Sequence, residues 1–320
     1  MIFNIVKYRG VKEKIMVKVK TPYLEIVNPN SIGKRENPIQ LNDILSKANS
    51  ESLTPVSAMA EKVIVVCIDE QLDFMPDGSL GVPNADKDVE RLTKFIYENM
   101  DGISKIAVSI DTHIPHQIFH PCWWIDKDGN HPAPYTVITL KDLDEGNYKA
   151  VIKPIESRDY VKHLEEDGKK NLVIWPYHCI QGTTGCALDN QFTNMVYFHE
   201  VSKKSVPITI VKGQDPLSEM YGIIRPEYDT KGYINISFLN LLAKYDKIII
   251  AGEAKSHCVL ETIRQILEYF AGQPEVTNKI YILEDCMSSI PGFEDATEEA
   301  FENFRKVYGV HIVKSTDDII

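Results

Sequence analysis

Short apolar runs rich in β-branched residues recur along the chain, and stretches with helical spacing separate them. The runs are KVIVVCID, ISKIAVSID, NLVIWP, PITIVKG, KIIIAGE and KIYILED, and each ends at a charge, Gly or Pro. The helical stretches include KDVERLTKFIYENM, CVLETIRQILEYFAG and TEEAFENFRKVYG. Because parallel strands need long crossovers, which are usually helices, the alternation predicts a three-layer α/β/α fold with a mostly parallel central sheet of about six strands.

The first 60 residues have a different character from the rest of the chain. They are rich in Lys, Asn and Ser, and their apolar runs are short. KIMVKVK alternates like a half-buried strand, whereas IQLNDILSKA has the spacing of a short amphipathic helix. We therefore expect an N-terminal appendage over residues 1–60, packed on the core or on another subunit, and a main domain over residues 61–320. A partly ordered tail is the alternative.

Composition excludes several classes of protein. The net charge is -11, which argues against nucleic-acid binding because that task needs a basic surface. No apolar run reaches the length of a membrane span, and charges interrupt the N-terminal MIFNIVKYRGVKEK, which makes a poor signal peptide. We expect a cytoplasmic protein with no membrane association. The six cysteines are scattered without a C-x-x-C pair, which favours free thiols.

Three reactive residue types stand where predicted strands end. Asp69, Lys212 and the GEAKSHC turn that carries Cys258 each close a strand, and ligands of parallel sheets bind beyond those ends. A cysteine attacks as its thiolate, which an adjacent base and a nearby ammonium both favour. The start of a predicted helix at Cys258 favours the thiolate as well. Taken singly, the residues fit a buried thiol, a helix cap and a solvated lysine; their common position makes them a candidate catalytic set.

A second set of residues could bind a metal ion. Asp111 and His113 form an Asp-x-His pair at the end of a strand, and His178 could complete a set of three ligands. Oxygen and imidazole ligands suit Zn, Fe or Mn, and three of them leave positions open. A short Asp-x-His pair is common by chance, so spacing alone supports this site weakly.

Five sequence blocks resemble those of a known family. CIDEQLDFMPDGSLGVPNAD is similar to the opening of nicotinamidases, and DTHIPH to their metal-binding segment. WPYHCIQGTTG matches their Trp-Pro-x-His-Cys-x-Gln-Gly-Thr segment, KGQDPLSEMYG their Lys-Gly-x-Asp-Pro stretch, and AGEAKSHCV the turn that bears their nucleophile. The blocks keep the family's order from about Val63 to the C-terminus. The chain thus resembles the nicotinamidase/isochorismatase-like superfamily of cysteine hydrolases.

The resemblance implies catalytic roles for the first set. Cys258 would attack the carbon of a small amide and form a thioester as ammonia leaves. Asp69 would take the thiol proton and pass it to the amine, and Lys212 would stabilise the anionic states. The backbone N–H groups of Ala254 and Cys258 would form the oxyanion hole, where each donor contributes about 3–4 kcal/mol. The family's cis peptide bond would lie at Glu253–Ala254.

The resemblance also implies a metal site and an aromatic pocket. Asp111, His113 and His178 match the ligands of one divalent metal, Zn being the first choice and Fe or Mn the others. In nicotinamidases this metal binds the pyridine nitrogen. Phe74 and Trp175 match the aromatic walls of the ring pocket, and Tyr221 is a further candidate wall. Core packing is the ordinary alternative for all three aromatic residues.

The chain departs from the family's pattern at three places. Some members have an extra metal-associated His at the position of Gln117, which His116 and His120 flank here. The segment between the second and third metal ligands is long, and we expect an insertion at about 121–170, in which HPCWW is either buried scaffold or a lid. The nucleophile turn carries His257, which is not assigned as a base because neighbouring positions at a helix start point in different directions.

Three functions remain open from the sequence. The first is a metal-dependent nicotinamidase that releases nicotinic acid and ammonia. The second is another small-amide or carbamoyl hydrolase that keeps the Asp, Lys and Cys set, and the third is a non-catalytic binding or scaffold protein on the same fold. Isochorismatases proper use no cysteine, so Cys258 argues against their reaction. The expected partner is a small-molecule amide, and a homo-oligomer is possible.

Overall fold

The computed structural model describes residues 17–166 and 170–320. Its central sheet has six parallel strands in the order β10-β9-β8-β1-β2-β7. The strands are β1 Val63–Ile68, β2 Lys105–Asp111, β7 Ile208–Lys212, β8 Lys247–Gly252, β9 Ile280–Leu283 and β10 His311–Val313. The predicted parallel sheet of about six strands is confirmed.

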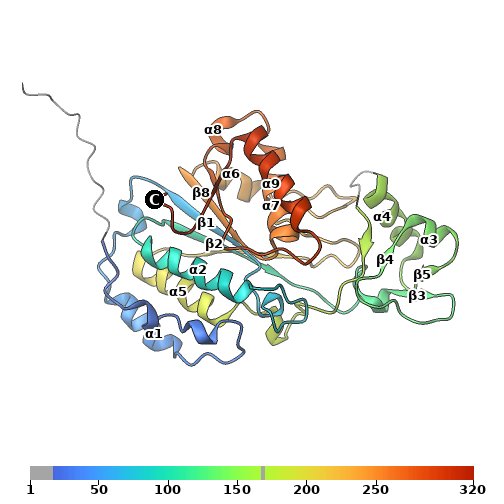
Figure 1. Cartoon of the computed structure of the whole chain (residues 1–320), viewed down its shortest axis with the longest axis horizontal. Helices are drawn as coiled ribbons and strands as arrows, with labels where there is room; N and C mark the ends of the chain where they lie inside the picture. Colours follow the sequence, from blue (N-terminus) through green and yellow to red (C-terminus); the bar gives the residue numbers. More distant parts are fainter. Residues whose placement is uncertain (1–16, 167–169) are drawn as a thin grey trace, which may run out of the picture.

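Helices cover both faces of this sheet, which gives the three predicted layers (Figure 1). Two long helices, α2 Ala85–Glu98 and α5 Asn190–Lys203, contribute buried residues to the hydrophobic core on one face. The core on the other face takes residues from α6 Ile236–Leu242, α7 Leu260–Tyr269, α8 Pro274–Thr277 and α9 Glu294–Tyr308.

Strand β1 shows why its sequence is apolar without alternation. Successive strand residues point to opposite faces of a sheet. Val63, Val65 and Cys67 join the core under α2 and α5, whereas Ile64 and Val66 join the core under α6 and α7. Because helices cover both faces, both sets of side chains are buried, as expected for a central parallel strand.

One predicted strand was placed wrongly. In NLVIWP only Leu172–Val173 is a strand, β6, and it pairs with β4 Val137–Ile138 outside the central sheet. The sixth central strand is β10, a short strand at the edge next to β9. An apolar run of this length cannot reveal which sheet it joins, because periodicity reports burial and not partners.

The N-terminal segment packs against the core from residue 17 onward. Helix α1 Leu41–Asn49 confirms the predicted amphipathic helix and lies beside α5 (Figure 1). Ile26, Val27 and Ile44 are fully buried there. KIMVKVK lies partly outside the described residues, and its described part, 17–20, forms no strand.

The region 121–170 forms a small subdomain at one end of the molecule (Figure 1). It contains β3 Trp124–Asp126 paired with β5 Tyr148–Ala150, and the helices α3 Leu140–Asp144 and α4 Pro154–Glu166. Trp123 and Trp124 are buried and donate their indole N–H groups within this region and to the Ile118 carbonyl, so they are scaffold and not a lid.

Single turns complete the description of regular structure. The short 3₁₀ turns are Tyr23–Glu25, Pro29–Ser31, Val56–Ala58, Leu72–Phe74, Pro121–Trp123 and Thr184–Cys186, and Lys255–Val259 is a π-helical turn. Within the described ranges, no helix is long and apolar enough to cross a membrane.

Candidate active site

The predicted catalytic and metal-binding residues meet at the carboxyl end of the sheet. Strands β8, β1, β2 and β7 are neighbours in that order. Asp69 follows β1, Asp111 ends β2 and Lys212 ends β7. The turn bearing Cys258 follows β8. Four adjacent parallel strands therefore deliver these groups to one edge of the sheet, as the sequence predicted.

Lys212 is the centre of this arrangement. Its side chain is fully buried, and its ammonium nitrogen lies 2.9 Å from Asp69 Oδ2 and 3.0 Å from Asp111 Oδ1. The same nitrogen lies 3.7 Å from Cys258 Sγ and donates to the Met220 carbonyl at 3.1 Å. One cation thus contacts both the proposed base and the proposed nucleophile.

Burial and charge set the protonation states of the three groups. Burial would lower the pKa of Lys212, but Asp111 and Asp69 raise it well above its usual value, so Lys212 is an ammonium. Burial raises the pKa of the Cys258 thiol well above its usual value despite Lys212. The resting thiol is therefore protonated, whereas the sequence suggested a favoured thiolate. Burial also raises the pKa of Asp69, which Lys212 partly offsets.

Two polar residues that the sequence did not single out hold the strand ends together. The Ser109 hydroxyl donates to Asp69 Oδ1 at 2.5 Å and accepts the Asp69 N–H at 2.9 Å. The Gln71 side chain accepts the Asp111 N–H at 2.6 Å and donates to the Asp111 carbonyl at 2.7 Å. The Gln in the motif block was visible in the sequence, but its partner was not, because the pairing crosses strands.

The turn after β8 has the local structure that the resemblance implied. The Glu253–Ala254 peptide bond is cis, as expected. Cys258 lies in the π-helical turn Lys255–Val259, just before α7 begins at Leu260. The Ala254 carbonyl accepts the N–H groups of both His257 and Val259, which closes the turn around the thiol.

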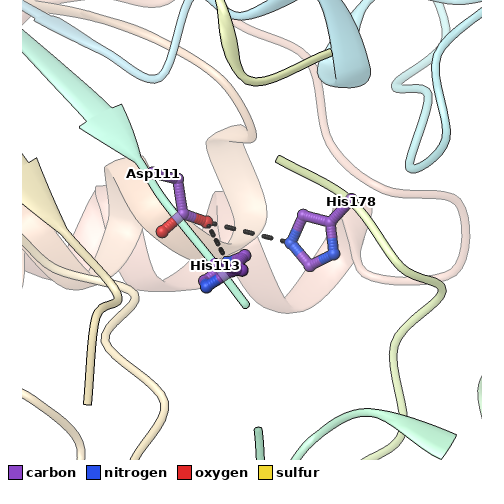
Figure 2. Close-up of side chains that lie close together, drawn as sticks. All are labelled: Asp111, His113 and His178. Carbon is purple, nitrogen blue, oxygen red and sulfur yellow. Dashed lines mark hydrogen bonds and ion pairs between the residues drawn. The ribbon is translucent and has the colours of Figure 1, made fainter. Parts of the chain in front are cut away.

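Asp111, His113 and His178 form a compact, buried group (Figure 2). Their ligand atoms all lie within 4.8 Å of one another. Nε2 of His113 is 2.8 Å from Asp111 Oδ2, and Nε2 of His178 is 3.8 Å from the same oxygen. The three residues predicted as metal ligands are therefore brought together.

The hydrogen bonds of the two rings support a cation among these atoms. Nδ1 of His113 is 3.0 Å from the Gly213 carbonyl, and Nδ1 of His178 is 2.8 Å from the Pro176 carbonyl. A carbonyl only accepts, so each Nδ1 carries the proton and each Nε2 presents a lone pair. Two such lone pairs and a carboxylate oxygen converge, and this donor set of two nitrogens and one oxygen fits a divalent metal.

Gly213 also contributes to the shape of this centre. Its φ is +78°, and a Cβ there would lie 2.5 Å from Asp111 Oδ1 and 2.6 Å from Cε1 of His113. Only glycine fits such a position without moving these two side chains. The Gly after Lys212 in the motif block therefore has a steric reason.

The residues around the metal group that were left open have structural positions. Gln117 is buried and donates to the Gly213 carbonyl, which also accepts from His113. His120 is buried, with Nδ1 3.1 Å from the Ile114 carbonyl, and its Nε2 has no hydrogen-bond partner among the described residues. Burial lowers the pKa of His120 to about 4, so the ring is neutral. His116 is exposed.

A narrow cavity opens onto both the thiol and the metal group. Phe74, Trp175 and Tyr221 line it, as predicted. The other lining residues are Leu80, Asp111, His178, Glu219, Ala254, His257, Cys258 and Ile290. The His257 ring packs edge-on against Trp175 and Tyr221, and burial lowers its pKa to about 4. It is a neutral wall of the cavity, consistent with its not being assigned as the base.

Glu219 is a cavity residue that the sequence did not reveal. It is buried, its Oε1 accepts the Met220 N–H at 3.2 Å, and its Oε2 has no hydrogen-bond donor among the residues described. Burial raises the pKa of its carboxyl to about 7, which His113 partly offsets. It stands in the loop after β7, where the only sequence signal was its place in the KGQDPLSEMYG block.

Comparisons with known proteins agree with this site. No protein-family model matches the chain. It is 24% identical to the nicotinamidase of Saccharomyces cerevisiae over 68% of this chain and 92% of that protein. Its structure resembles the Acinetobacter baumanii nicotinamidase (TM-score 0.55, 19% identity, 81% of this chain and 98% of that one). It also resembles yeast nicotinamidase bound to nicotinaldehyde (TM-score 0.55, 19% identity, 79% and 99%).

The fold and the grouping of Asp, Lys and Cys beside an Asp-His-His set define a hydrolase of the isochorismatase-like class. The resemblance seen in the motif blocks is thus confirmed at the level of the fold. Within that class, these similar proteins are nicotinamidases.

Proposed function

We propose that this chain is a cysteine-dependent amidohydrolase that converts nicotinamide and water into nicotinic acid and ammonia. The observation that carries the proposal is the position of the Lys212 ammonium, which contacts Asp69, Asp111 and Cys258 at once. It joins the thiol to the residues of the metal group within one cavity. The similarity to nicotinamidases supports the pyridine amide as the substrate.

In the proposed reaction, Asp69 is the base and Cys258 the nucleophile. Asp69 takes the thiol proton, and Cys258 Sγ attacks the amide carbon to form a tetrahedral intermediate. The raised pKa of Asp69 suits a group that must accept a proton and then release it. Asp69 passes the proton to the nitrogen as the C–N bond breaks and ammonia leaves. Water then hydrolyses the thioester, which frees the thiol and nicotinic acid.

Two further groups would stabilise the negative charge that develops. Lys212 stays an ammonium and lies beside Sγ, so it favours the thiolate as the proton leaves. The N–H groups of Ala254 and Cys258 are the proposed oxyanion donors, and losing one such donor costs a factor of about 10²–10³ in kcat.

We assign the metal site to Asp111, His113 and His178, with zinc as the first choice because of the N₂O donor set. A divalent ion bound there would hold the pyridine nitrogen and so orient the ring. Phe74, Trp175 and Tyr221 would form the walls around that ring.

The domain division is also a proposal. We propose a hydrolase domain over residues 61–320 with residues 121–170 inserted into it, and residues 1–60 as an appendage. The packing of α1 on α5 supports an appendage that rests on the same chain. A homo-oligomer is a further possibility that solution scattering would test.

The decisive experiment is ammonia release from nicotinamide, pyrazinamide and a panel of small aliphatic and carbamoyl amides. We expect turnover of the two ring amides by wild type, none by Cys258→Ala, and about one metal per chain by elemental analysis. Cys122→Ala, which changes a cysteine outside the cavity, is the matched control and should keep full activity. Turnover of aliphatic amides alone would replace nicotinamide by another amide, and wild-type behaviour of Cys258→Ala would reject cysteine catalysis.

A further inference from the structure

A groove continues the catalytic cavity outward. It has a volume of about 440 Å³ and shares three lining residues with the cavity, namely Leu80, Trp175 and Ile290. None of Asp111, His178 and Cys258, which form the chemical end of the cavity, lines the groove. The groove therefore opens from the end of the cavity that is away from the reacting groups.

The groove is aromatic and carries no charged side chain. Tyr135 from the 121–170 region and Phe293 form its rim, and they are 59% and 44% exposed. Val173 on β6 forms part of the wall. By contrast, the opening on the other side of His257 is lined by Lys170, Glu261 and Arg264. Exposed aromatic rings around a concave surface indicate a place where apolar groups bind.

The chemistry of the proposed substrate fixes which of its atoms faces the groove. In nicotinamide the ring nitrogen and the carbon bearing the carboxamide flank C2. If the nitrogen points to the metal group and the carboxamide to Cys258, C2 is the innermost ring atom. C5 lies opposite C2 on a six-membered ring, so it is the outermost atom.

We propose that this groove, formed around Tyr135, Val173 and Phe293, binds an apolar substituent on C5 of the pyridine ring. The enzyme would then accept 5-aryl and 5-alkyl nicotinamides as a substrate class. The inference rests on the proposed nicotinamidase function.

The test compares nicotinamide with 5-phenylnicotinamide and with 5-carboxynicotinamide, whose charge the groove disfavours. Burial of a phenyl group is expected to lower KM by about tenfold relative to nicotinamide, with the carboxylate disfavoured. Val173→Trp fills the groove and should reduce kcat/KM for 5-phenylnicotinamide by about tenfold or more while nicotinamide changes less than about twofold. Val137→Trp, the cross-strand neighbour outside the groove lining, is the matched control.

Phe293→Ala is a second variant that removes a half-exposed ring and leaves the sheet untouched. It should also weaken 5-phenylnicotinamide selectively. Hydrolysis of nicotinamide without hydrolysis of the 5-phenyl compound would overturn this inference alone. Equal effects of both variants on both substrates would also overturn it, whereas no turnover of any pyridine amide would reject the proposed function with it.

A different observation concerns Glu253, directly before the proposed oxyanion donor Ala254. Glu253 is fully buried, and its Oε2 accepts the Ser288 N–H at 3.3 Å. The Ser288 carbonyl accepts the Lys255 N–H at 2.8 Å. The backbone of Ser288 thus binds the residues on both sides of Ala254.

A second carboxyl group completes this arrangement. Asp88 on α2 is buried and contacts the Glu253 carboxyl. Asp88 Oδ2 and Glu253 Oε1 have no other donor within the described chain. Two facing carboxyl oxygens avoid repulsion by sharing a proton, and burial raises the pKa of both groups, which keeps that proton in place.

We infer that protonated Glu253 is a positioning residue that fixes the Ala254 N–H in the oxyanion hole. Glu253→Gln keeps a hydrogen-bonding side chain of the same shape and should retain kcat within about threefold. Glu253→Leu has similar volume without the polar atoms and should lower kcat about 100-fold with little change in KM, the size expected for a displaced oxyanion donor. Glu298→Leu, at an exposed neighbouring position, is the control.

Binding of pyridine-3-carbaldehyde separates this role from general loss of structure. Addition of the thiol to the aldehyde forms a C–S bond and an oxyanion, whereas nicotinate binds without that step. The Leu variant should lose affinity for the aldehyde about 100-fold and keep its affinity for nicotinate. Wild-type kcat in the Leu variant, or equal losses in the Gln and Leu variants, would overturn the inference.

Discussion

At the scale of single residues, a buried lysine is explained by its partners. A buried ammonium without counter-charge would lose its proton or destabilise the fold. Lys212 has Asp69 and Asp111 within 3.0 Å, so its charge persists. The same pairing keeps Asp111 ionised, because burial alone would raise its pKa but His113 and Lys212 lower it well below its usual value.

Ser109→Ala tests how Asp69 is tuned. The hydroxyl donates to Asp69 and lowers the pKa that burial raises. Its removal should raise the pKa of Asp69, so the acidic limb of the kcat/KM profile moves to higher pH. A hydrogen bond to a charged group contributes about 1.5–3 kcal/mol, so kcat/KM at pH 7 should fall about tenfold or more. Ser104→Ala, another buried serine beside β2, should leave the profile unchanged; an unshifted profile in Ser109→Ala would contradict the assignment.

Glu70→Gln tests a buried carboxyl that lies next to Asp69. Neither oxygen of Glu70 has a hydrogen-bond partner in the described structure, and burial raises its pKa well above 4.5. The unfolded group loses its proton above that pH while the folded group keeps it, so the free energy of unfolding falls as the pH rises. Thermal unfolding should show Glu70→Gln more stable than wild type by about 1–3 kcal/mol at pH 8, with a smaller difference at pH 4.5. A pH-independent difference would argue against a raised pKa.

At the scale of elements, the segment that carries His178 is fixed by a neighbouring turn. The carboxylate of Asp73, in the 3₁₀ turn after β1, accepts the Cys179 N–H at 2.7 Å. Gly185 packs so closely that a Cβ would lie 2.1 Å from Asp73 Oδ2. Two loops from distant parts of the chain thus hold the third metal ligand in position.

Asp73→Ala should therefore weaken metal binding without touching a ligand. Loss of an orienting partner typically costs a factor of about 10–100 in metal affinity. Competition with a chelator would measure the affinity, and circular dichroism would confirm that the fold is kept. Asp77→Ala, at an exposed carboxylate in the same loop, is the control. Equal metal affinity in both variants would contradict the proposed role.

At the scale of the whole molecule, the N-terminal segment shares the core of the sheet. Gly33 N–H donates to Asp189 Oδ2 at 2.7 Å, and Asn28 N–H donates to the Gln191 side chain at 2.8 Å. Ile44 on α1 is fully buried. These contacts tie residues 17–60 to the start of α5, so we expect them to unfold together with the main domain.

Ile44→Ala checks that expectation. Truncation of a fully buried isoleucine costs about 2–5 kcal/mol. Urea unfolding followed by tryptophan fluorescence should show a lower midpoint for the whole protein, because all three tryptophans lie beyond residue 60. Leu41→Ala, on the same helix at a position 40% exposed, should shift the midpoint much less. An unchanged midpoint in Ile44→Ala would describe an independent appendage.

The parts of the fold that the sequence predicted are those with strong local signals. Both-face burial makes β1, β2 and β8 continuous apolar runs, and parallel topology then requires their carboxyl ends to meet. Ser109, Glu219 and Glu253 could not be predicted, because their roles depend on which loops pack together. The protonated state of the Cys258 thiol also escaped prediction, since the depth of burial cannot be read from the order of residues.

The Lys212 bridge has a consequence for how this site can vary. Its one positive charge serves a carboxylate on each side, so a substitution in the catalytic half alters the electrostatic field at the metal half, and the reverse. Paired substitutions at Asp69 and Asp111 should therefore give effects that do not add. Any route by which such an enzyme acquires a new ligand set would pass through compensating changes in both halves, because neither can be exchanged as an independent module.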